Sequence, residues 1–373
     1  MELRASVLSA DELEDIDMST MNVLSKTGVS IPDSDACRLL EEAGAQVNHN
    51  ARIVKIPEDM VRKSISLAVR KHVDLYDRVG QSFIRFDGRR TYHGSGFDAT
   101  YVLDSRTMVR RPSTKRDVAG FARLADGLPN IHVVGTQAIP QDVPASSAEL
   151  HAVEEILNNT SKPCHFSPSN GQTARAVFEM VRLACGRNDL SSKSPVISLT
   201  CPTTPLRWEK RALEALMESA RAGVPIHIIS QPIAGITAPV TLAGVLLLQN
   251  AEILSGLVMV QLIRPQTGVI YGYAPLLFDM RETNTANASP EGVIMRVASA
   301  QIAKHYGLPC LSTHSTGSHV HDEQTAWEKA MTGLAVYLSG ADMIQNGGMF
   351  SSGLTVSFEQ LVIDHEICTY LDR

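Results

Sequence analysis

The stretch PVISLTCPTTPLRWEKRALEALMESARAGVPIHIIS, residues 195–230, contains one complete unit of the fold that the sequence predicts. It opens with an apolar run at 195–198 and ends in another at 225–228. Each run begins with proline, which costs no ladder hydrogen bond at the first residue of a strand. Between the runs, apolar residues recur at the spacing of an amphipathic helix: Leu213, Leu216, Met217 and Ala220. The stretch therefore predicts a strand, a helix and a second strand.

The same unit recurs along the chain. Other short apolar runs fit the strand pattern at 91–96, 131–137, 163–166, 268–273, 309–312 and 342–347. From residue 163 onward the runs start 30 to 43 residues apart, which suits a strand, a crossover helix and two loops. Eight such units between residues 91 and 373 predict an α/β fold, a (β/α)8 TIM barrel. A doubly wound open sheet is the alternative, but no GxGxxG motif follows an early strand, and eight units are many for such a sheet.

Residues 1–90 have a different pattern and predict an N-terminal helical cap and a β-ribbon that pack on the barrel of residues 91–373. The sequence Ser-Ala-Asp-Glu at 9–12 is a capping box that starts a helix. Residues 72–86 alternate between apolar and polar like a hairpin centred on Gly80. We expect this region to support the barrel and not to form a separate catalytic domain.

Composition excludes several classes of function. The 373 residues carry a net charge of -6, so no basic surface argues for binding to nucleic acid or to an anionic membrane. The six cysteines lie far apart and form no CxxC pair, which favours reduced thiols in a cytoplasmic protein. Residues 1–11 lack the apolar core of a signal peptide.

One segment, residues 241–263, has no lysine or arginine and is long enough to cross a bilayer. Four polar side chains within it would then lie in hydrocarbon: Gln249, Asn250, Glu252 and Gln261. We expect a buried barrel helix here, one that also offers an apolar surface for a homo-oligomer.

In a TIM barrel the chemistry belongs at the carboxyl ends of the strands, so the polar and aromatic residues there are candidates. They are His93, Asp98, Gln137, His165, Cys201, Thr203, Ser230, Gln231, Tyr271, Tyr273, Asp279, Arg281, His314, His319, His321, Asn346 and Phe350. The pair Asp279 and Arg281 suggests either an ion pair or a clamp for a substrate carboxylate.

A metal site is a weaker interpretation of the same region. His319 and His321 flank one residue and, on an extended segment, would face the same side, where they could share an ion with His314. No acidic or cysteine partner at a fixed spacing completes the set, so we predict no metal. Cys201 and Cys310 follow apolar runs, as packed thiols do, and no GxSxG, HExxH or P-loop motif occurs.

The later units resemble the trimethylamine:corrinoid methyltransferase family. The resemblance extends from about residue 9 to the end, and its most specific part is the PVTLAG…QNAE block. The blocks that carry it are residues 239–244, 249–252, 269–272, 279–281, 289–291, 322–324 and 359–364. It implies a TIM barrel that transfers a methyl group from a methylated amine to the cobalt(I) of a separate corrinoid protein.

The family archetype acts on trimethylamine and carries pyrrolysine, whereas this sequence contains only standard residues. The resemblance therefore implies a member that acts on a methylated amine, either a quaternary amine such as a betaine or trimethylamine itself. It also implies no tightly bound cofactor, with cobalamin carried by a partner corrinoid-binding protein. A quaternary amine leaves as a neutral tertiary amine, so the protein only has to position the cation and exclude water.

A quaternary ammonium group offers no N–H, so aromatic faces and carboxylates must recognise it, with about 0.5–2 kcal/mol for each cation–π contact. For the cation we expect Tyr271, Tyr273, Phe350 and Asp279. The other residues that we expect in the substrate site would bind a substrate carboxylate or hydroxyl or form the rest of the wall. They are Arg281, His165, His314, Gln137, Asn346 and His93.

Two other functions stay open from the sequence. One is a metal-dependent barrel hydrolase or lyase built on His93, His165, His314 and His319. The other is a non-catalytic barrel that binds a quaternary amine.

Overall fold

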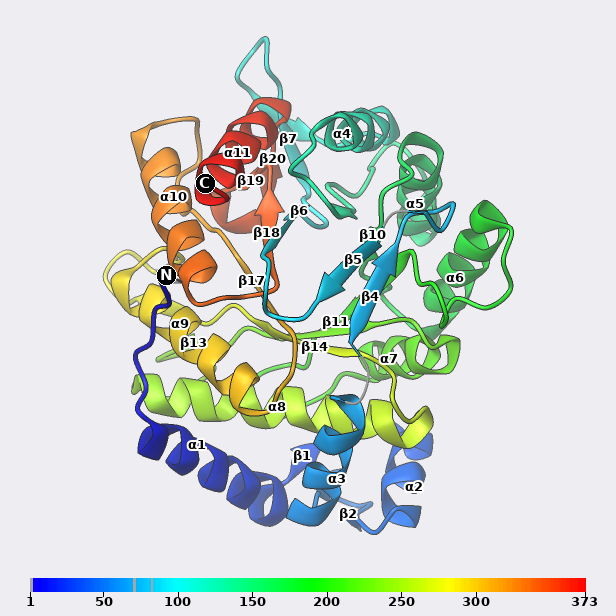
Figure 1. The fold of residues 1–373 in the computed structure, drawn as a ribbon, viewed down its shortest axis with the longest axis vertical. Helices are drawn as coiled ribbons and strands as arrows, with labels where there is room; N and C mark the ends of the chain where they lie inside the picture. The colour runs from blue at the N-terminus through cyan, green and yellow to red at the C-terminus, as the bar shows by residue number, and fades with distance from the viewer. Residues whose placement is uncertain (1–2, 70–71, 82) are drawn as a thin grey trace.

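A central barrel of eight parallel strands organises the chain (Figure 1). The computed structural model describes residues 3–69, 72–81 and 83–373. The strands follow the order β6-β18-β17-β14-β12-β11-β10-β9, and a parallel bridge between Gly94 and Val133 closes β6 onto the segment that leads into β9. Their bounds are β6 (Tyr92–Ser95), β9 (Val134–Gly135), β10 (Cys164–Phe166), β11 (Val196–Thr200), β12 (Ile226–Ser230), β14 (Val269–Tyr273), β17 (Cys310–Thr313) and β18 (Met343–Gly347). The predicted TIM barrel is confirmed.

A ring of helices surrounds the strands, as expected for βα units. They are α4 (Lys115–Gly127), α5 (Ala148–Asn159), α6 (Gly171–Cys185), α7 (Lys210–Ala222), α8 (Leu242–Ile263), α9 (Pro290–His305), α10 (Glu323–Leu338) and α11 (Phe358–Leu371). Helix α9 begins at a Ser-Pro cap: the Ser289 hydroxyl accepts a hydrogen bond from the Gly292 amide, and Pro290 occupies the first turn.

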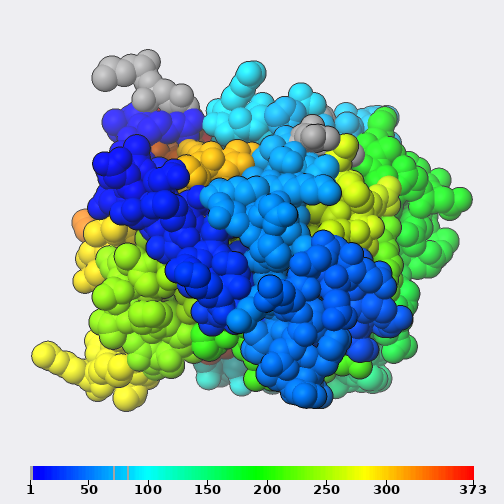
Figure 2. Space-filling model, turned by 90° about the horizontal axis from the view of Figure 1, so that it is seen from below, coloured from blue at the N-terminus to red at the C-terminus, as the bar shows by residue number. Residues whose placement is uncertain are grey.

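The N-terminal cap lies across one side of the barrel, against α8 (Figure 2). It contains α1 (Ala10–Asn22), a turn of π-helix η1 (Val23–Thr27), β1 (Val29–Ser30), α2 (Ser34–Glu42), β2 (Gln46–Asn48), β3 (Ile53–Lys55) and α3 (Glu58–Ala68). Side chains of the cap, such as Ile16 and Val54, share one hydrophobic core with Leu257 of α8. The predicted division at residue 90 therefore crosses a continuous core, and it remains a prediction.

The predicted β-ribbon is confirmed as an antiparallel pair, β4 (Val73–Tyr76) with β5 (Phe83–Phe86). Its buried side chains Leu75 and Phe86 pack on Ile197 and Leu311, which point into the barrel. The ribbon thus closes the amino-terminal end of the barrel, and the carboxyl-terminal end is left for the site.

Two small sheets and two short 3-10 helices, which the sequence does not predict, are built from the connections between barrel strands and helices. One sheet contains β19 (Met349–Phe350), β20 (Thr355–Val356), β7 (Tyr101–Leu103) and β8 (Arg110–Pro112). The other contains β13 (Ile233–Ala234), β15 (Leu276–Asp279) and β16 (Asn284–Ala286). The 3-10 helices are η2 (Ala145–Ser147) and η3 (Ser351–Gly353).

Helix α8 is buried as expected, although its length and apolarity alone would suit a membrane span. In its most apolar 18-residue window, 78% of the residues are buried inside the protein. Its polar side chains have protein partners: the Gln249 amide donates to the Ser299 hydroxyl at 2.9 Å, and Glu252 accepts from the Ser230 hydroxyl at 2.6 Å. Each hydrogen bond removes the cost of burying a polar group.

Candidate functional site

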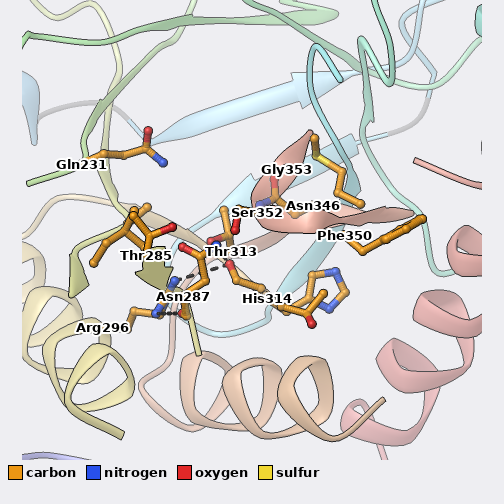
Figure 3. A pocket seen from close by; sticks show the side chains of 15 residues that line it. Gln231, Thr285, Asn287, Arg296, Thr313, His314, Asn346, Phe350, Ser352 and Gly353 are labelled. Atoms are coloured by element: carbon orange, nitrogen blue, oxygen red, sulfur yellow. Dashed lines mark hydrogen bonds between the residues drawn. The ribbon is translucent and has the colours of Figure 1, made fainter. Parts of the chain in front are cut away.

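A cavity of about 150 Å³ lies at the carboxyl ends of β14, β17 and β18 (Figure 3). Polar side chains from five segments line it, and Ala274, Leu276, Met349 and Phe350 form a smaller apolar part of its wall. The lining residues are Gln231, Ala274, Leu276, Thr285, Asn287, Arg296, Thr313, His314, Ser315, Thr316, Asn346, Met349, Phe350, Ser352 and Gly353. This is the position at which TIM-barrel enzymes place their chemistry.

Three of the ten predicted site residues line this cavity. His314 follows β17, and Asn346 and Phe350 lie on the segment that begins at the end of β18. We call residues 346–353 the mouth loop. Its backbone is unusual, because Asn346, Ser351 and Ser352 have φ angles of 75°, 53° and 55°, which non-glycine residues rarely adopt. Such conformations cluster at functional sites, where the surrounding structure must hold them.

The two tyrosines of β14 do not reach the cavity, which corrects the expected aromatic box. Tyr271 and Tyr273 are completely buried in the core between the barrel and its helices, and the Tyr271 hydroxyl donates to Asn250 Oδ1 at 3.2 Å. Successive side chains of a strand point to opposite faces, and in β14 it is Ile270 and Gly272 that face the interior. The tyrosines are therefore on the outer face of the strand.

Two other predicted residues, Gln137 and His93, stabilise the fold instead of lining the cavity. Gln137 accepts a hydrogen bond from the Gly96 amide at 2.9 Å and donates to the Gly347 carbonyl at 2.6 Å. His93 Nε2 lies 3.0 Å from Asp372 Oδ1, on α11's side of the barrel. These contacts hold neighbouring strand ends and the last helix together.

His165 is inside the barrel and outside the cavity. Its Nδ1 accepts from the Gln345 amide at 2.7 Å, and its ring lies 5.1 Å from that of His227. Burial lowers the pKa of His165 well below its ordinary range, so the ring is neutral.

Asp279 and Arg281 lie near the tip of the β15–β16 hairpin, exposed to solvent. Asp279 Oδ1 accepts from the amides of Arg281 and Glu282 at 2.8 and 3.2 Å. The pair therefore closes a turn, and neither side chain contributes to the cavity wall. Only the base of this hairpin, through Leu276 and Thr285, lines the cavity.

The most informative residue of the cavity is Arg296, which the sequence analysis missed. It projects from α9, its side chain is 0% exposed, and its guanidinium donates to the Asn287 carbonyl at 3.2 Å and to the Ser315 hydroxyl at 3.4 Å. Its Nε has no hydrogen-bond partner in the part of the chain that the structure describes. Burial lowers the pKa of Arg296 to about 10, so the group still carries its charge at neutral pH.

Among the described residues, no negative charge balances this cation. The cavity lining contains no aspartate or glutamate, and among the ion pairs of the described residues none includes Arg296. A buried charge without a counter-charge is costly, which indicates that a ligand supplies one. His314 does not add to the positive charge, because burial lowers its pKa to about 3.

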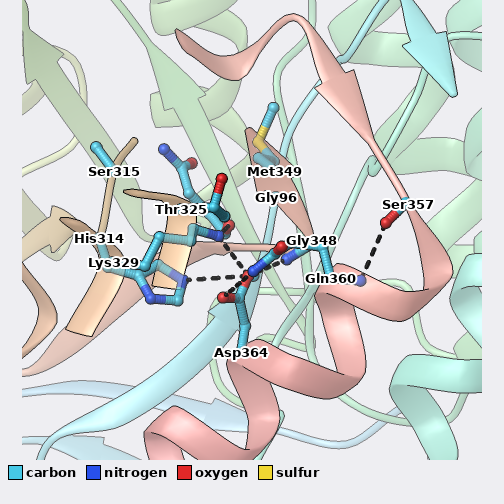
Figure 4. Close-up of polar contacts among 12 residues, drawn as sticks. Gly96, His314, Ser315, Thr325, Lys329, Gly348, Met349, Ser357, Gln360 and Asp364 are labelled. Atoms are coloured by element: carbon cyan, nitrogen blue, oxygen red, sulfur yellow. Dashed lines mark hydrogen bonds and ion pairs between the residues drawn. The ribbon is translucent and has the colours of Figure 1, made fainter. Parts of the chain in front are cut away.

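A buried ion pair lies behind the cavity (Figure 4). Lys329 of α10 and Asp364 of α11 are both 0% exposed and contact each other directly. The ion pair reaches the cavity through His314, whose Nε2 lies 3.9 Å from Asp364 Oδ2. The Gln360 side-chain amide donates to Asp364 Oδ1 at 2.9 Å.

The described residues do not form the metal site considered in the sequence analysis. Among the described residues, no group of three or more histidine, cysteine, aspartate or glutamate side chains is placed to hold an ion. His319 Nδ1 contacts the Ser351 hydroxyl at 2.7 Å, and His321 lies between Ser357 and Gln360. The two histidines of the HxH motif therefore hold the region around the mouth loop, and the four histidines of the hydrolase alternative do not converge.

Histidines whose pKa is lowered in the folded protein give a testable pH dependence of stability. Burial lowers the pKa of His132 to about 4 and that of His227 to about 3, whereas an unfolded histidine titrates near 6.5. Below pH 6.5 the unfolded chain takes up protons that the folded chain does not, so the free energy of unfolding decreases as the pH drops. Each such histidine contributes about 1.4 kcal/mol per pH unit. Burial raises the pKa of Asp98 to about 7, and this acid opposes the trend.

His227→Leu should therefore flatten the dependence by about 1.4 kcal/mol per unit between pH 6 and 4. Urea unfolding at several pH values measures it, and the exposed His49 provides the matched substitution His49→Leu. An unchanged slope in His227→Leu would show that the ring is charged in the folded protein.

Comparison with known proteins decides the family. The model of the family described as "Trimethylamine methyltransferase (MTTB)" matches residues 3–373. The chain belongs to the trimethylamine methyltransferase family. A trimethylamine methyltransferase of Desulfitobacterium hafniense (strain DSM 10664 / DCB-2) is 32% identical over 367 residues, covering 98% of this chain and 74% of the relative.

A second relative differs in its named substrate. The glycine betaine methyltransferase of Desulfitobacterium hafniense (strain Y51) is 31% identical over 370 residues, 98% of this chain and 76% of the relative. The solved structure of the Methanosarcina barkeri monomethylamine methyltransferase has the same fold, with a TM-score of 0.64 at 14% identity, over 98% of this chain and 81% of that one. The chain is thus a methyltransferase of the trimethylamine methyltransferase family, and the predicted resemblance is confirmed.

Proposed function

We propose that this methyltransferase demethylates a quaternary amine that carries a carboxylate, a betaine, and transfers the methyl group to the cobalt(I) of a corrinoid protein. The observation that carries the choice of donor is Arg296, a buried cation without a counter-charge in the cavity wall. A guanidinium binds a carboxylate through two parallel hydrogen bonds. Trimethylamine and its ammonium ion have no group that could do so.

A zwitterionic donor, which carries both a cation and a carboxylate, also fits the rest of the cavity. The trimethylammonium group of a betaine would be a second buried positive charge unless its own carboxylate neutralised Arg296, and a zwitterion does this internally. The apolar wall, which includes Met349 and Phe350, provides a surface for methyl groups. Phe350 is 1% exposed, so its contact with the cation would be largely desolvated, a condition that strengthens a cation–π interaction.

The absence of an acid among the lining residues favours a quaternary over a neutral tertiary amine. In the transfer, the C–N bonding electrons stay with nitrogen and cobalt(I) supplies the pair for the new C–Co bond. A quaternary nitrogen leaves as a neutral amine, whereas a neutral tertiary amine must first gain a proton. His314, with its pKa lowered to about 3, has no proton to give at neutral pH. The protein thus binds, orients and dehydrates the donor.

The proposed methyl acceptor is the cobalamin of a corrinoid protein. We propose a cytoplasmic location for the reaction. The cavity lies at the open end of the barrel, opposite the β4–β5 ribbon, where an acceptor has to approach. Family membership supports the acceptor.

A methyl-transfer assay with three matched donors tests the function. Cob(I)alamin, reduced with titanium(III) citrate, serves as the acceptor, and its conversion to methylcob(III)alamin is followed by absorbance. Trimethylglycine and choline share the same cationic head, but only trimethylglycine has a carboxylate, and trimethylamine lacks both. We expect trimethylglycine to be the preferred donor. Preference for choline or trimethylamine would contradict the choice of donor, and no transfer from any methylated amine would contradict the proposed function.

A further inference from the structure

The mouth loop brings Asn346, Met349 and Phe350 to the cavity, yet its own conformation is poorly self-supporting. Residues 346–353 contain the last two residues of β18, the two-residue strand β19 and one turn of 3-10 helix. Three of their non-glycine residues are in the left-handed region of the backbone map. A segment of this kind keeps its shape only where its surroundings determine it.

Two buried charges hold the start of the loop. The Lys329 ammonium donates to the Asn346 carbonyl at 3.1 Å, and the Gly348 amide donates to Asp364 Oδ2 at 2.7 Å. Lys329 and Asp364 thus satisfy each other and also fix backbone atoms on both sides of Gly347 (Figure 4). Charged partners make stronger hydrogen bonds than neutral ones.

Two histidines hold the rest of the loop. His319 Nδ1 contacts the Ser351 hydroxyl at 2.7 Å, next to Ser352, which lines the cavity. The His321 ring lies 5.2 Å from the Phe350 ring, centroid to centroid, and is fixed in turn by the Ser357 hydroxyl at 3.0 Å. Each end of the loop therefore has its own anchor.

We propose that Lys329, Asp364, His319 and His321 are positioning residues that set the mouth loop against the methyl donor. None of the four lines the cavity, so they would act on the donor only through the loop. Through the loop they fix the cavity's apolar wall and the side chain of Asn346. The inference rests on the proposed function for its substrate, but the anchoring of the loop can be measured without any substrate. Small displacements of positioned groups are costly in catalysis, which gives the anchors a role beyond stability.

The test separates positioning from stability by removing both charges together. Replacing both partners of a buried ion pair by apolar residues is often neutral for stability, whereas removing one leaves an unpaired charge. We therefore compare Lys329→Met/Asp364→Leu with the wild type and with Lys115→Met/Glu154→Leu. The last variant removes the outer Lys115–Glu154 ion pair between α4 and α5, which does not contact the mouth loop.

In the double variant that removes the buried pair, we expect the KM for trimethylglycine to rise by about tenfold or more, with faster amide hydrogen exchange in residues 346–353. The outer-pair variant should match the wild type in both. If the buried-pair variant does not fold, His319→Ala tests the inference instead, because it leaves the ion pair intact. For His319→Ala we expect a raised KM for trimethylglycine and faster amide exchange at residues 351–353, with an unchanged melting temperature.

Unchanged KM and unchanged exchange in a folded buried-pair variant, or in His319→Ala, would overturn the inference. A wild-type protein that transfers no methyl group would contradict the proposed function instead, and the exchange rates would still decide whether these residues anchor the loop.

Discussion

Arg296→Met should lower kcat/KM for trimethylglycine by about 30-fold or more, because truncating one partner of a buried charge pair costs about 2–5 kcal/mol. Methionine fills a similar volume but carries no charge, so the carboxylate of the donor would be buried without a partner. Activity with choline should fall much less or increase, since the variant no longer places a cation beside a cationic donor. The measurement is the cobalamin methylation assay with both donors.

Arg296→Met should also change the stability of the free protein. The expected direction is opposite to that for an arginine that stabilises the fold. Without a ligand, Arg296 is a buried cation with no counter-charge, so Arg296→Met should raise the free energy of unfolding of the free protein. Arg296→Lys is the control, because it keeps the charge and loses the planar fork that binds a carboxylate. A destabilised Arg296→Met with unchanged use of trimethylglycine would show that the arginine stabilises the fold and binds no donor.

Trp208→Ala should lower the free energy of unfolding by about 3–5 kcal/mol, in a single transition. Trp208 is 0% exposed, and its indole donates to the Ser255 hydroxyl of α8 at 2.9 Å. Its backbone amide donates to the Ser30 carbonyl of the N-terminal cap at 2.9 Å. The residue therefore lies where cap and barrel share their core, and its loss should weaken both together.

Urea unfolding followed by circular dichroism measures this effect. The chain's other tryptophan, Trp327, is 69% exposed, so Trp327→Ala is a matched control that should change stability by no more than about 0.5 kcal/mol. Two separate transitions, with only one affected by Trp208→Ala, would mean that residues 1–90 fold as an independent domain.

The barrel could be predicted because its signal is repeated and local. A proline, a short apolar run and a helix-period pattern recur in successive units, and each unit has one solution that buries its apolar faces. The runs at 195–198 and 225–228 became β11 and β12, and the spacing between them fixed the crossover helix α7. The small sheets above the barrel, the 3-10 helices and the short strands β1, β2 and β3 of the cap were not predicted, because elements of two or three residues leave no periodic pattern.

The site was harder to predict because it depends on which face of each strand a side chain occupies. In β14 every residue is apolar, glycine or tyrosine, so no polar alternation indicates that Tyr271 and Tyr273 point outward. His314, Asn346 and Phe350 were found because they lie at or just beyond the carboxyl ends of strands, where side chains face the cavity.

Arg296 was missed because the search was confined to strand ends. One signal was present in the sequence: it is a single arginine within a segment of α9 that is otherwise small or apolar, Gly292 to Ala303 apart from Gln301. An unpaired charge on a buried helix face is rare and marks a functional site more often than a structural one.

A crystal structure of the protein with trimethylglycine tests the central claim most directly. We predict that the carboxylate lies within about 2.7–3.2 Å of the Arg296 guanidinium nitrogens, with the trimethylammonium group against Phe350. A donor bound in the cavity with its carboxylate away from Arg296, or bound elsewhere on the barrel, would contradict the account.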